Sequence, residues 1–356
     1  MKINHSNFLK LAFNIAKVNL GKTGLNPSVG CVVVKNNSVI SSGKTSLNGR
    51  PHAEFNALKS KKNFKNSDLY LTMEPCTHYG VTPPCTNIIA KKGIKRVFYS
   101  FNDIDKRTAK KSKTELAKKK IKVYKKSSNH FHDFYQSYFS IQKNVIPFID
   151  AKIAISKDYL TINKKSKWIT NSLSRNRAHL IRSEYDMIIS TSKSIYQDNS
   201  LLNCRLNGFN NSKPDLIIVD LNLKIKININ LFKKNNKRKI FIVTSVLKSK
   251  KISYLKKIGV KIIPIKSLNN KSDFINLFKN LKKYAYNRIL VESGLIFLNE
   301  LLKNKLIFNL YIFQSSIKLG KRGKNNTSNN IIKKFKLKKK IQVNLDGDSL
   351  YKIKIK

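Results

Sequence analysis

The sequence predicts an α/β protein with two domains, a three-layer sandwich over residues 1–146 and a domain with a mostly parallel sheet over residues 147–356. A chain of 356 residues is long enough for two or three domains. Short apolar runs typical of strands alternate with helix-like segments, as in sheets that are covered by helices. This alternation restarts near Pro147, which sets the predicted boundary.

In the first domain, a hairpin precedes alternating helices and strands. An amphipathic helix is expected over residues 8–17, and Asn36-Asn37 is expected to form the turn between strands 30–34 and 38–42. The elements that follow are a helix starting at His52, a strand over 69–72, a helix starting at Cys85, a strand over 96–100, a helix over 114–119 and a strand over 121–124. Elements in this order form a three-layer sandwich with helix starts along one edge of the sheet.

The second domain is expected to follow a helical linker whose aromatic residues pack between the domains (Phe131, Phe134, Tyr135, Tyr138 and Phe139). Its predicted strands cover residues 148–155, 186–190, 216–220, 240–244, 261–265 and 288–291. One predicted helix carries Arg175 to Arg182 and another ends at Asp198. Further helices are predicted over residues 250–258, over residues 273–286 and directly after Gly294. Helices between strands favour a mostly parallel sheet. The last strand runs into Glu292-Ser293-Gly294, a small-residue turn of the kind whose backbone N–H groups bind phosphate.

The composition indicates a folded and strongly basic protein. Apolar residues make up 41% of the chain, which is enough for real cores, and the formal net charge is +53. Such a charge raises the alternative of a nucleic-acid partner. Because the lysines are dispersed and come with abundant Asn and Ile, we interpret the charge as the result of an AT-rich genome and of solvated surfaces. We therefore expect no specific nucleic acid as a partner.

Cysteine usage and hydropathy favour a cytoplasmic protein. Four cysteines do not form a disulfide framework at this length, and two of them are candidate metal ligands, which implies a reducing compartment. No stretch of the sequence is long and apolar enough to span a bilayer, so no membrane is expected as a partner.

The clearest chemical signal is His52-Ala53-Glu54, followed by Cys76 and Cys85. One imidazole and two thiolates are zinc ligands, and a catalytic zinc keeps its fourth tetrahedral position for water. Glu54 is then placed to take a proton from that water and deliver it to a departing amine, as in nucleobase deaminases. Cys85 opens a helix, where the dipole favours a thiolate. The alternative, a buried histidine beside two structural thiols, does not account for this context.

The eight residues between the two cysteines distinguish this site from deaminases with Cys-x-x-Cys. The run from Glu74 to Cys85, with Asn26-Pro27-Ser28-Val29-Gly30-Cys31 upstream, resembles the deaminase half of the bifunctional riboflavin-biosynthesis deaminase/reductase family. The resemblance implies a cytidine-deaminase-like fold for the first domain. His78 lies in the loop between the cysteines, and the Asn26 amide could face a bound heterocycle, so both are predicted to contact the substrate.

The resemblance continues through the second domain and implies a dihydrofolate-reductase-like fold there. The motifs Lys152-x-Ala154-x-Ser156-x-Asp158, Ser166-x-Trp168-Ile169-Thr170 and Glu292-x-Gly294 fall in the family's order. By this resemblance, the residues that contact the substrate are Ser166, Arg182, Leu202, Arg205 and Glu292. The residues that line the NADPH site are Ala154, Trp168, Ser194, Asp198, Asp220 and Gly294. Arg182 and Arg205 suit a phosphate monoester, because a guanidinium binds two of its oxygens at once.

The family's reactions imply the substrate and both cofactors. A zinc-dependent hydrolysis replaces the ring amine of 2,5-diamino-6-ribosylamino-4(3H)-pyrimidinone 5′-phosphate with a carbonyl, and NADPH then reduces the ribosyl chain to a ribityl chain. The expected partner is therefore this small phosphorylated pyrimidine. Because members of the family associate, a homo-oligomer is also expected.

Some positions depart from the family's pattern. Val81 stands where the family commonly has Lys or Arg, Tyr159 and Ser293 stand where it has Gly, and Asn199-Ser200 replaces Asp-Pro. The change at Tyr159 matters because Gly permits a tight turn. The departures in the second domain favour an alternative in which that domain is an inactive scaffold, and NADPH binding would distinguish the two hypotheses. A deaminase directed at RNA or DNA by the charge of +53 is a further alternative, which the long loop between the cysteines and the ordered second domain disfavour.

Overall fold

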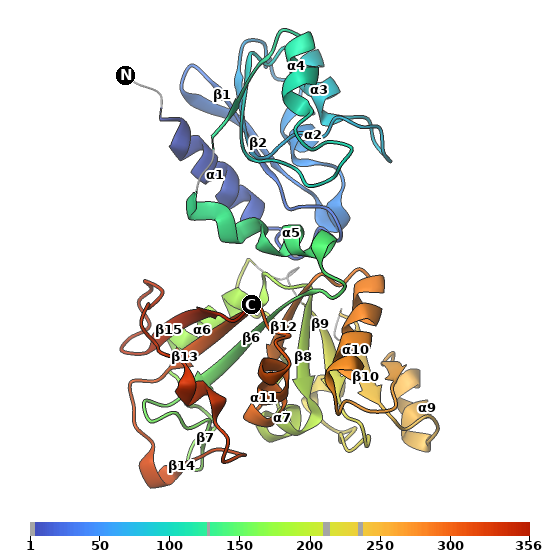
Figure 1. The fold of residues 1–356 in the computed structure, drawn as a ribbon, viewed down its shortest axis with the longest axis vertical. Helices are drawn as coiled ribbons and strands as arrows, with labels where there is room; N and C mark the ends of the chain where they lie inside the picture. The colour runs from blue at the N-terminus through green and yellow to red at the C-terminus, as the bar shows by residue number, and fades with distance from the viewer. Residues whose placement is uncertain (1–3, 127–128, 209–213, 234–237) are drawn as a thin grey trace. The chain divides into compact units, whose positions relative to one another are not determined.

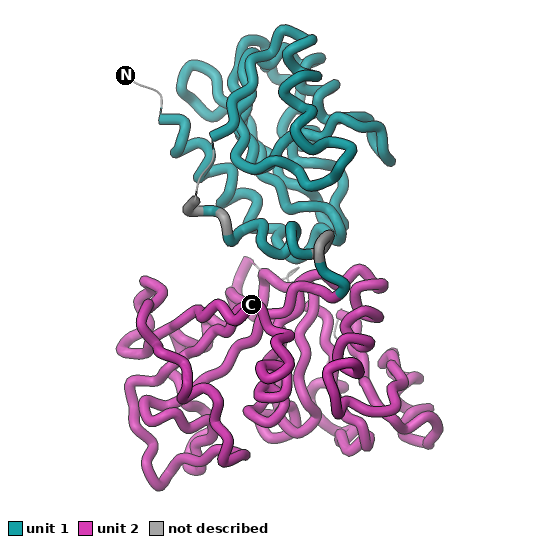
Figure 2. Tube along the Cα trace, in the orientation of Figure 1, with its two compact units in different colours: residues 1–145 teal, residues 146–356 magenta. Residues whose placement is uncertain are grey.

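The computed structural model describes residues 4–126, 129–208, 214–233 and 238–356. The chain divides into two compact units, residues 1–145 and 146–356 (Figure 2). Each unit has its own main sheet and its own hydrophobic cores. Among the described residues, no helix has both the length and the hydropathy needed to cross a membrane.

The first unit is built around a five-stranded sheet with the order β2-β1-β3-β4-β5 (Figure 1). Its strands are β1 (Gly30–Lys35), β2 (Ser38–Lys44), β3 (Asp68–Met73), β4 (Arg96–Phe101) and β5 (Lys122–Lys125). Asn36 and Asn37 join β1 to β2 with φ angles of 50° and 60°, the left-handed conformation that a type I′ hairpin turn requires at both central residues. β1 also pairs antiparallel with β3, whereas β3, β4 and β5 are parallel. The predicted hairpin is confirmed.

Helices cover both faces of this sheet and make the predicted three layers (Figure 1). They are α1 (His5–Lys17), α2 (Ala53–Leu58), α3 (Cys85–Lys91) and α4 (Ser112–Lys118), with a 3-10 turn η1 (Leu47–Gly49). Because successive side chains of a strand point to opposite faces, Val32 of β1 packs with α1 and Val33 packs with α2, α3 and α4. A Cβ atom on Gly30 would lie 1.9 Å from the carbonyl oxygen of Ala12, so glycine lets α1 approach β1 closely.

A segment rich in aromatic residues ends the first unit. It consists of the 3-10 helix η2 (Asn129–Tyr135) and of α5 (Gln136–Lys143). The Tyr135 hydroxyl hydrogen-bonds Thr72 Oγ1 at 2.6 Å and donates to the carbonyl of Ser28 at 3.0 Å. Phe131 stacks on Phe13 with ring centroids 3.9 Å apart. These rings pack with the core of the first unit, and the expectation that they also lie between the domains stays a prediction.

The second unit contains an eight-stranded sheet with the order β11-β10-β9-β8-β12-β6-β13-β15. Its strands are β6 (Phe148–Ile155), β8 (Met187–Thr191), β9 (Asp215–Val219), β10 (Ile240–Thr244), β11 (Lys261–Pro264), β12 (Arg288–Glu292), β13 (Asn309–Gln314) and β15 (Ser349–Lys354), and β7 (Ile162–Asn163) pairs separately with β14 (Gly323–Lys324). Neighbouring strands of the large sheet are parallel except β13 and β15. The sheet is mostly parallel, as predicted, and β13 and β15 are strands that the sequence analysis did not predict.

Helices cover both faces of this sheet as well. They are α6 (Ser172–Arg182), α7 (Ser192–Asp198), α8 (Asn230–Lys233), α9 (Lys250–Lys257), α10 (Lys271–Lys283) and α11 (Leu295–Lys303), with 3-10 turns η3 (Gly320–Arg322) and η4 (Ile331–Lys334). In β12, Ile289 and Val291 belong to the core cluster that includes α10 and α11, whereas Leu290 belongs to the cluster that includes α6 and α9, which is why these three central residues are all apolar. The strands β8, β12 and β6 are adjacent and parallel, so their carboxyl ends meet at one edge of the sheet.

Candidate active sites

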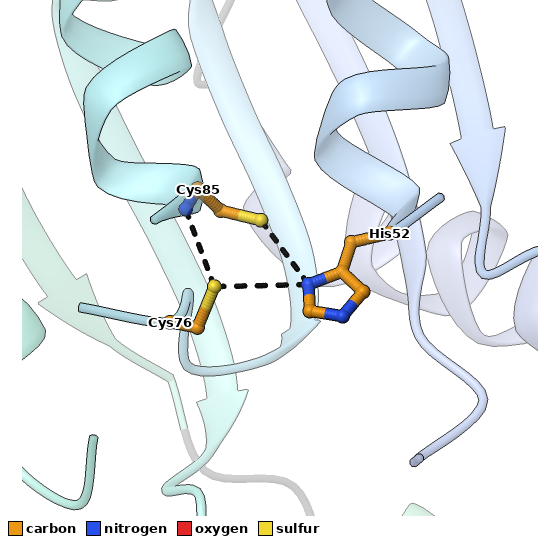
Figure 3. A group of neighbouring side chains, drawn as sticks. All are labelled: His52, Cys76 and Cys85. Atoms are coloured by element: carbon orange, nitrogen blue, oxygen red, sulfur yellow. Dashed lines mark hydrogen bonds between the residues drawn. The ribbon is translucent and has the colours of Figure 1, made fainter. Parts of the chain in front are cut away.

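Three predicted metal ligands meet in the first unit (Figure 3). His52 immediately precedes α2, Cys76 follows β3, and Cys85 is the first residue of α3. His52 Nδ1 lies 3.7 Å from Cys76 Sγ and 3.4 Å from Cys85 Sγ, as Figure 3 marks with dashed lines. All three ligand atoms lie within 4.8 Å of one another. The fold thus brings one nitrogen and two sulfurs together from three separate segments.

These separations fit a zinc ion. Tetrahedral zinc binds nitrogen at about 2.1 Å and thiolate sulfur at about 2.3 Å, which places such ligand atoms roughly 3.5 Å apart. The observed nitrogen–sulfur distances of 3.4 Å and 3.7 Å agree with this geometry. The Cys85 N–H donates to Cys76 Sγ at 3.2 Å, and hydrogen bonding from Cys85 lowers the pKa of the Cys76 thiol to about 4. This environment favours the thiolate of Cys76, which is the form of cysteine that binds metal, whereas the hydrogen bond with Cys76 and burial raise the pKa of Cys85, contrary to the expectation from its helix start.

Glu54 lies in the first turn of α2, two residues after His52. Only 4% of the residue is exposed, and this burial raises the pKa of its carboxyl group to about 7. A carboxyl group that exchanges a proton near neutral pH suits general acid–base chemistry. The assignment of Glu54 as the catalytic residue stays a prediction at this point.

Two further predicted residues are held in loops of the first unit. His78 Nδ1 hydrogen-bonds Thr108 Oγ1 at 2.9 Å. Asn26 donates from Nδ2 to the carbonyl of Gly49 at 3.2 Å. Gly49 has a φ of 90°, and a Cβ atom there would lie 2.4 Å from Asn26 Nδ2, so this contact requires glycine. Both side chains are anchored, and their contact with the substrate stays a prediction.

Sequence reasoning missed one cation beside the metal ligands, Arg50. Its Nη1 donates to Thr82 Oγ1 at 3.0 Å and lies 3.5 Å from His52 Nε2. Arg50 therefore links the segment before α2 to the loop between the two cysteines. The available signal was a basic residue two positions before a metal ligand, and such a signal is weak in a chain with 72 lysines and arginines.

In the second unit, a buried carboxylate pairs with two cations at the carboxyl edge of the sheet. Glu292 ends β12 and lies in register with Lys152 of β6. Its oxygens accept hydrogen bonds from Arg182 Nε at 2.5 Å and Arg182 Nη2 at 2.9 Å, and Lys152 Nζ lies 3.6 Å away. Burial alone would raise the pKa of Glu292, but the charges of Arg182 and Lys152 lower it to about 2. Burial also lowers the pKa of Lys152, a residue that the sequence analysis quoted in a motif and did not assign to a site.

The pairing with Glu292 changes the interpretation of Arg182. The sequence predicts that its guanidinium binds the substrate phosphate. In the structure two of its nitrogens pair with Glu292, and Nη1 donates to the carbonyl of Asn203 at 3.2 Å. Arg205 is exposed and donates from Nη1 to Asn203 Oδ1 at 2.8 Å. Two nitrogens of Arg182 are thus engaged with Glu292, whereas Arg205 is exposed, and contact of either arginine with the substrate phosphate stays a prediction.

Three of the predicted NADPH residues lie near the starts or ends of helices. Ser194 Oγ accepts from the Gly294 N–H at 3.2 Å, which joins the first turn of α7 to the start of α11. Gly294 gives α11 no side-chain cap, so the first N–H groups of this helix fit a pyrophosphate. Asp198 ends α7, and burial raises the pKa of its carboxyl group.

Two other predicted residues are bound within the protein itself. The carboxylate oxygens of Asp220 accept backbone N–H groups from Lys224 at 2.9 Å and from Ile225 at 2.6 Å. Leu202 is buried with a φ of 47°, and its carbonyl accepts from Arg238 Nη1 at 2.6 Å. These contacts stabilise the local backbone, and a role in binding the cofactor or the substrate stays a prediction for both residues.

The remaining predicted residues lie on or after β6. Ala154 is half-buried on this strand. Trp168 is 49% exposed, and the Arg175 guanidinium lies 4.5 Å from its ring centroid. Ser166 Oγ accepts from the Trp168 N–H at 3.1 Å. Lys167 Nζ also lies 5.1 Å from this ring centroid, and contact of Trp168 with the cofactor stays a prediction.

The backbone accommodates two of the departures from the family's pattern. Tyr159 has a φ of 64° and Asn199 has a φ of 40°, which are left-handed conformations of the kind that glycine adopts at low cost. The turn before Leu160 is closed by a hydrogen bond from the Leu160 N–H to Ser156 Oγ at 2.9 Å. Asn330 Nδ2 donates to the Tyr159 carbonyl at 2.8 Å. The tight turn therefore exists without glycine.

Comparisons with known proteins match both units. Residues 147–350 match the RibD C-terminal domain, and residues 2–101 match the cytidine and deoxycytidylate deaminase zinc-binding region. The riboflavin biosynthesis protein RibD of Buchnera aphidicola subsp. Baizongia pistaciae is 33% identical over 359 residues, which cover 95% of this chain and 96% of that protein. RibD of Aquifex aeolicus is 31% identical over 314 residues, which cover 86% of this chain and 85% of that protein.

Solved structures give the same result. A deaminase/reductase from Thermotoga maritima, described as diaminohydroxyphosphoribosylaminopyrimidine deaminase/5-amino-6-(5-phosphoribosylamino)uracil reductase, is 25% identical with a TM-score of 0.82 and covers 99% of this chain and 98% of that one. RibD of Acinetobacter baumannii is 25% identical with a TM-score of 0.80, covering 98% of each chain. With a deaminase zinc-binding region in its first unit and a RibD C-terminal domain in its second, the chain belongs to the RibD family of riboflavin biosynthesis proteins.

Proposed function

We propose that this chain catalyses two successive steps of riboflavin biosynthesis. It deaminates 2,5-diamino-6-ribosylamino-4(3H)-pyrimidinone 5′-phosphate by hydrolysis and then reduces the ribosyl chain to a ribityl chain with NADPH. The observation that carries the proposal is the cluster of His52, Cys76 and Cys85 beside buried Glu54, in a chain whose second unit is a RibD C-terminal domain. The name of the Thermotoga maritima relative contains both activities.

In the deaminase, His52, Cys76 and Cys85 would hold the zinc ion. When bound there, zinc supplies a Lewis acid that makes hydroxide accessible at neutral pH. Glu54 takes the proton of the attacking water and delivers it to the amine that leaves the ring. Its buried carboxyl group, whose pKa lies near 7, passes between the two protonation states that this transfer needs.

In the reductase, NADPH supplies the hydride. Reduction at C1′ of the ribosyl group would break the bond from C1′ to the ring oxygen, and that oxygen would take up a proton. Lys152 is the proton donor that we assign, because burial lowers the pKa of its ammonium group and so favours release of the proton. Glu292 orients Lys152, and Arg182 fixes Glu292 through two hydrogen bonds.

Two observations support an active second unit over an inactive scaffold. Tyr159 keeps the left-handed conformation that the family's glycine would otherwise supply. The Lys152–Glu292–Arg182 network is complete, although it requires three charged side chains to be removed from water. Burying such charges is costly, and their retention fits a site that uses them.

The proposed setting is the cytoplasm, where reducing conditions keep Cys76 and Cys85 available for zinc. The proposed partner is the phosphorylated pyrimidine itself, and we expect a homo-oligomer, as in the family. Sedimentation velocity of the purified chain tests the oligomer: a species at the mass of a single chain at micromolar concentration would contradict it.

Arg205→Ala tests the assignment of the reductase substrate site. The variant loses a charge-assisted hydrogen bond to the phosphate, so KM for the deaminated intermediate should rise about 10- to 150-fold. The measurement is NADPH oxidation at varied concentrations of that intermediate. Ammonia release by the same variant is the internal control and should equal that of the wild type, because Arg205 belongs to the second unit. An unchanged KM would exclude Arg205 from the phosphate site.

A further inference from the structure

Arg50 is a cation beside the metal ligands. It is half-buried, and its Nη1 donates to Thr82 Oγ1 at 3.0 Å. Within the described ranges of the chain, none of the ion pairs includes Arg50. Zinc with two thiolates carries no net charge, so the metal site does not supply the missing anion.

Arg50 and His52 each direct a hydrogen-bond donor toward the other. His52 Nδ1 faces both sulfurs, so its Nε2 carries the proton when Nδ1 binds the metal. A metal-bound imidazole ordinarily donates this second N–H to an acceptor. The neighbour of Nε2 is Arg50 Nη1 at 3.5 Å, and a guanidinium nitrogen can only donate. One anionic oxygen beside this pair, within hydrogen-bond reach of both nitrogens, would satisfy both donors.

The loop between the two cysteines runs close to Arg50 and His78. A Cβ atom on Gly80 would lie 3.8 Å from Arg50 Nη2 and 3.8 Å from His78 Nε2, so these two side chains flank the Gly80 backbone. Thr82 follows on the same loop and accepts from Arg50 through its oxygen, which leaves its hydroxyl hydrogen to donate elsewhere. Donors from Arg50, His52 and Thr82 therefore lie close together.

We propose that Arg50 and Thr82 form an anion subsite that binds the 5′-phosphate of the substrate at the deaminase centre. This inference rests on the proposed function, because the substrate of that reaction carries the phosphate. A guanidinium binds phosphate with two parallel hydrogen bonds, which a lysine cannot reproduce. Arg50 thereby becomes a specificity-determining residue that selects the phosphorylated pyrimidine over its dephosphorylated form.

The test compares Arg50→Gln with the wild-type chain, both loaded with zinc, on the phosphorylated substrate and on the same compound after phosphatase treatment. For the phosphorylated substrate, KM of ammonia release should rise about 10- to 150-fold, the loss expected for a hydrogen bond to a charged group. KM for the dephosphorylated compound should stay within twofold, and zinc content should not change. Arg107→Gln is the matched control, since it removes an arginine whose charge Asp105 already neutralises at 2.6 Å.

Equal effects on both compounds would overturn the proposal, because Arg50 would then contact the ring or only anchor the loop. An unchanged KM for the phosphorylated substrate would overturn it as well. Calorimetric binding of the phosphorylated substrate to zinc-loaded protein keeps this test separate from the proposed reaction. If the wild type released no ammonia, the proposed function would be wrong. The anion subsite at Arg50 would still be tested by comparing the Kd of the phosphorylated substrate for the wild type with that for Arg50→Gln.

Discussion

Glu54→Gln should release ammonia about 100- to 10,000-fold more slowly than the wild-type chain while it keeps its zinc. The amide occupies nearly the same volume as the carboxyl group, so the buried start of α2 should fold as before. It cannot accept a proton from water, and it cannot deliver one to the departing amine. Ammonia release under saturating substrate measures the loss, and metal analysis of the same sample measures the zinc.

Glu115→Gln is the control for this substitution. Glu115 is on α4 and forms an exposed ion pair with Lys118, so its loss should leave the rate unchanged. NADPH oxidation with added deaminated intermediate should also persist in Glu54→Gln. A Glu54→Gln rate within tenfold of the wild type would show that another group transfers the proton.

Cys85→Ser should remove the zinc and, with it, all measurable deamination. A serine hydroxyl is not deprotonated at neutral pH and is a poor replacement for thiolate, so only two of the three ligands remain. We expect the zinc content to fall from about one ion per chain to near zero after dialysis, since a catalytic site with two protein ligands holds the ion weakly. Elemental analysis and ammonia release are the two measurements.

Cys204→Ser provides the matched thiol control. Cys204 is buried in the second unit and does not belong to the metal cluster. This variant should keep both zinc and deamination, whereas the Cys85→Ser variant should keep only the reduction of added intermediate. Full zinc occupancy in Cys85→Ser would exclude Cys85 as a ligand.

The metal cluster was predictable because its signals are local. His52 and Glu54 are two residues apart, and Pro84-Cys85 marks a helix start that the sequence itself indicates. The hairpin turn at Asn36-Asn37 was predictable for the same reason, because asparagine tolerates the left-handed conformation. Local chemistry of this kind requires no knowledge of how distant segments pack.

The pairings at the second site depend on tertiary structure and could not be predicted in detail. Arg182 and Glu292 are 110 positions apart, and only the parallel alignment of β6, β8 and β12 brings the end of β12 next to α6. For this reason the sequence assigned the Arg182 guanidinium to the substrate phosphate, whereas the structure pairs it with Glu292. Lys152 remained unassigned because its register with Glu292 becomes known only with the sheet.

The missed strands have a similar origin. β15 reads Ser-Leu-Tyr-Lys-Ile-Lys, and its lysines weaken the apolar pattern that marks a strand. It is held by antiparallel pairing with β13, in which Leu350 lies opposite Phe313. In a chain with 72 basic residues, lysine at strand positions carries little information about exposure, so pairing partners decide the fold there.

The central claim, that one chain carries out both steps, is tested most directly in a single tube. Zinc-loaded protein is mixed with the diaminopyrimidinone ribosylamino phosphate and NADPH, and ammonia release and NADPH oxidation are followed together. The account predicts that ammonia appears first and that NADPH oxidation follows until one NADPH has been consumed for each ammonia released. Ammonia release with NADPH left untouched would contradict it and would make the second unit a scaffold.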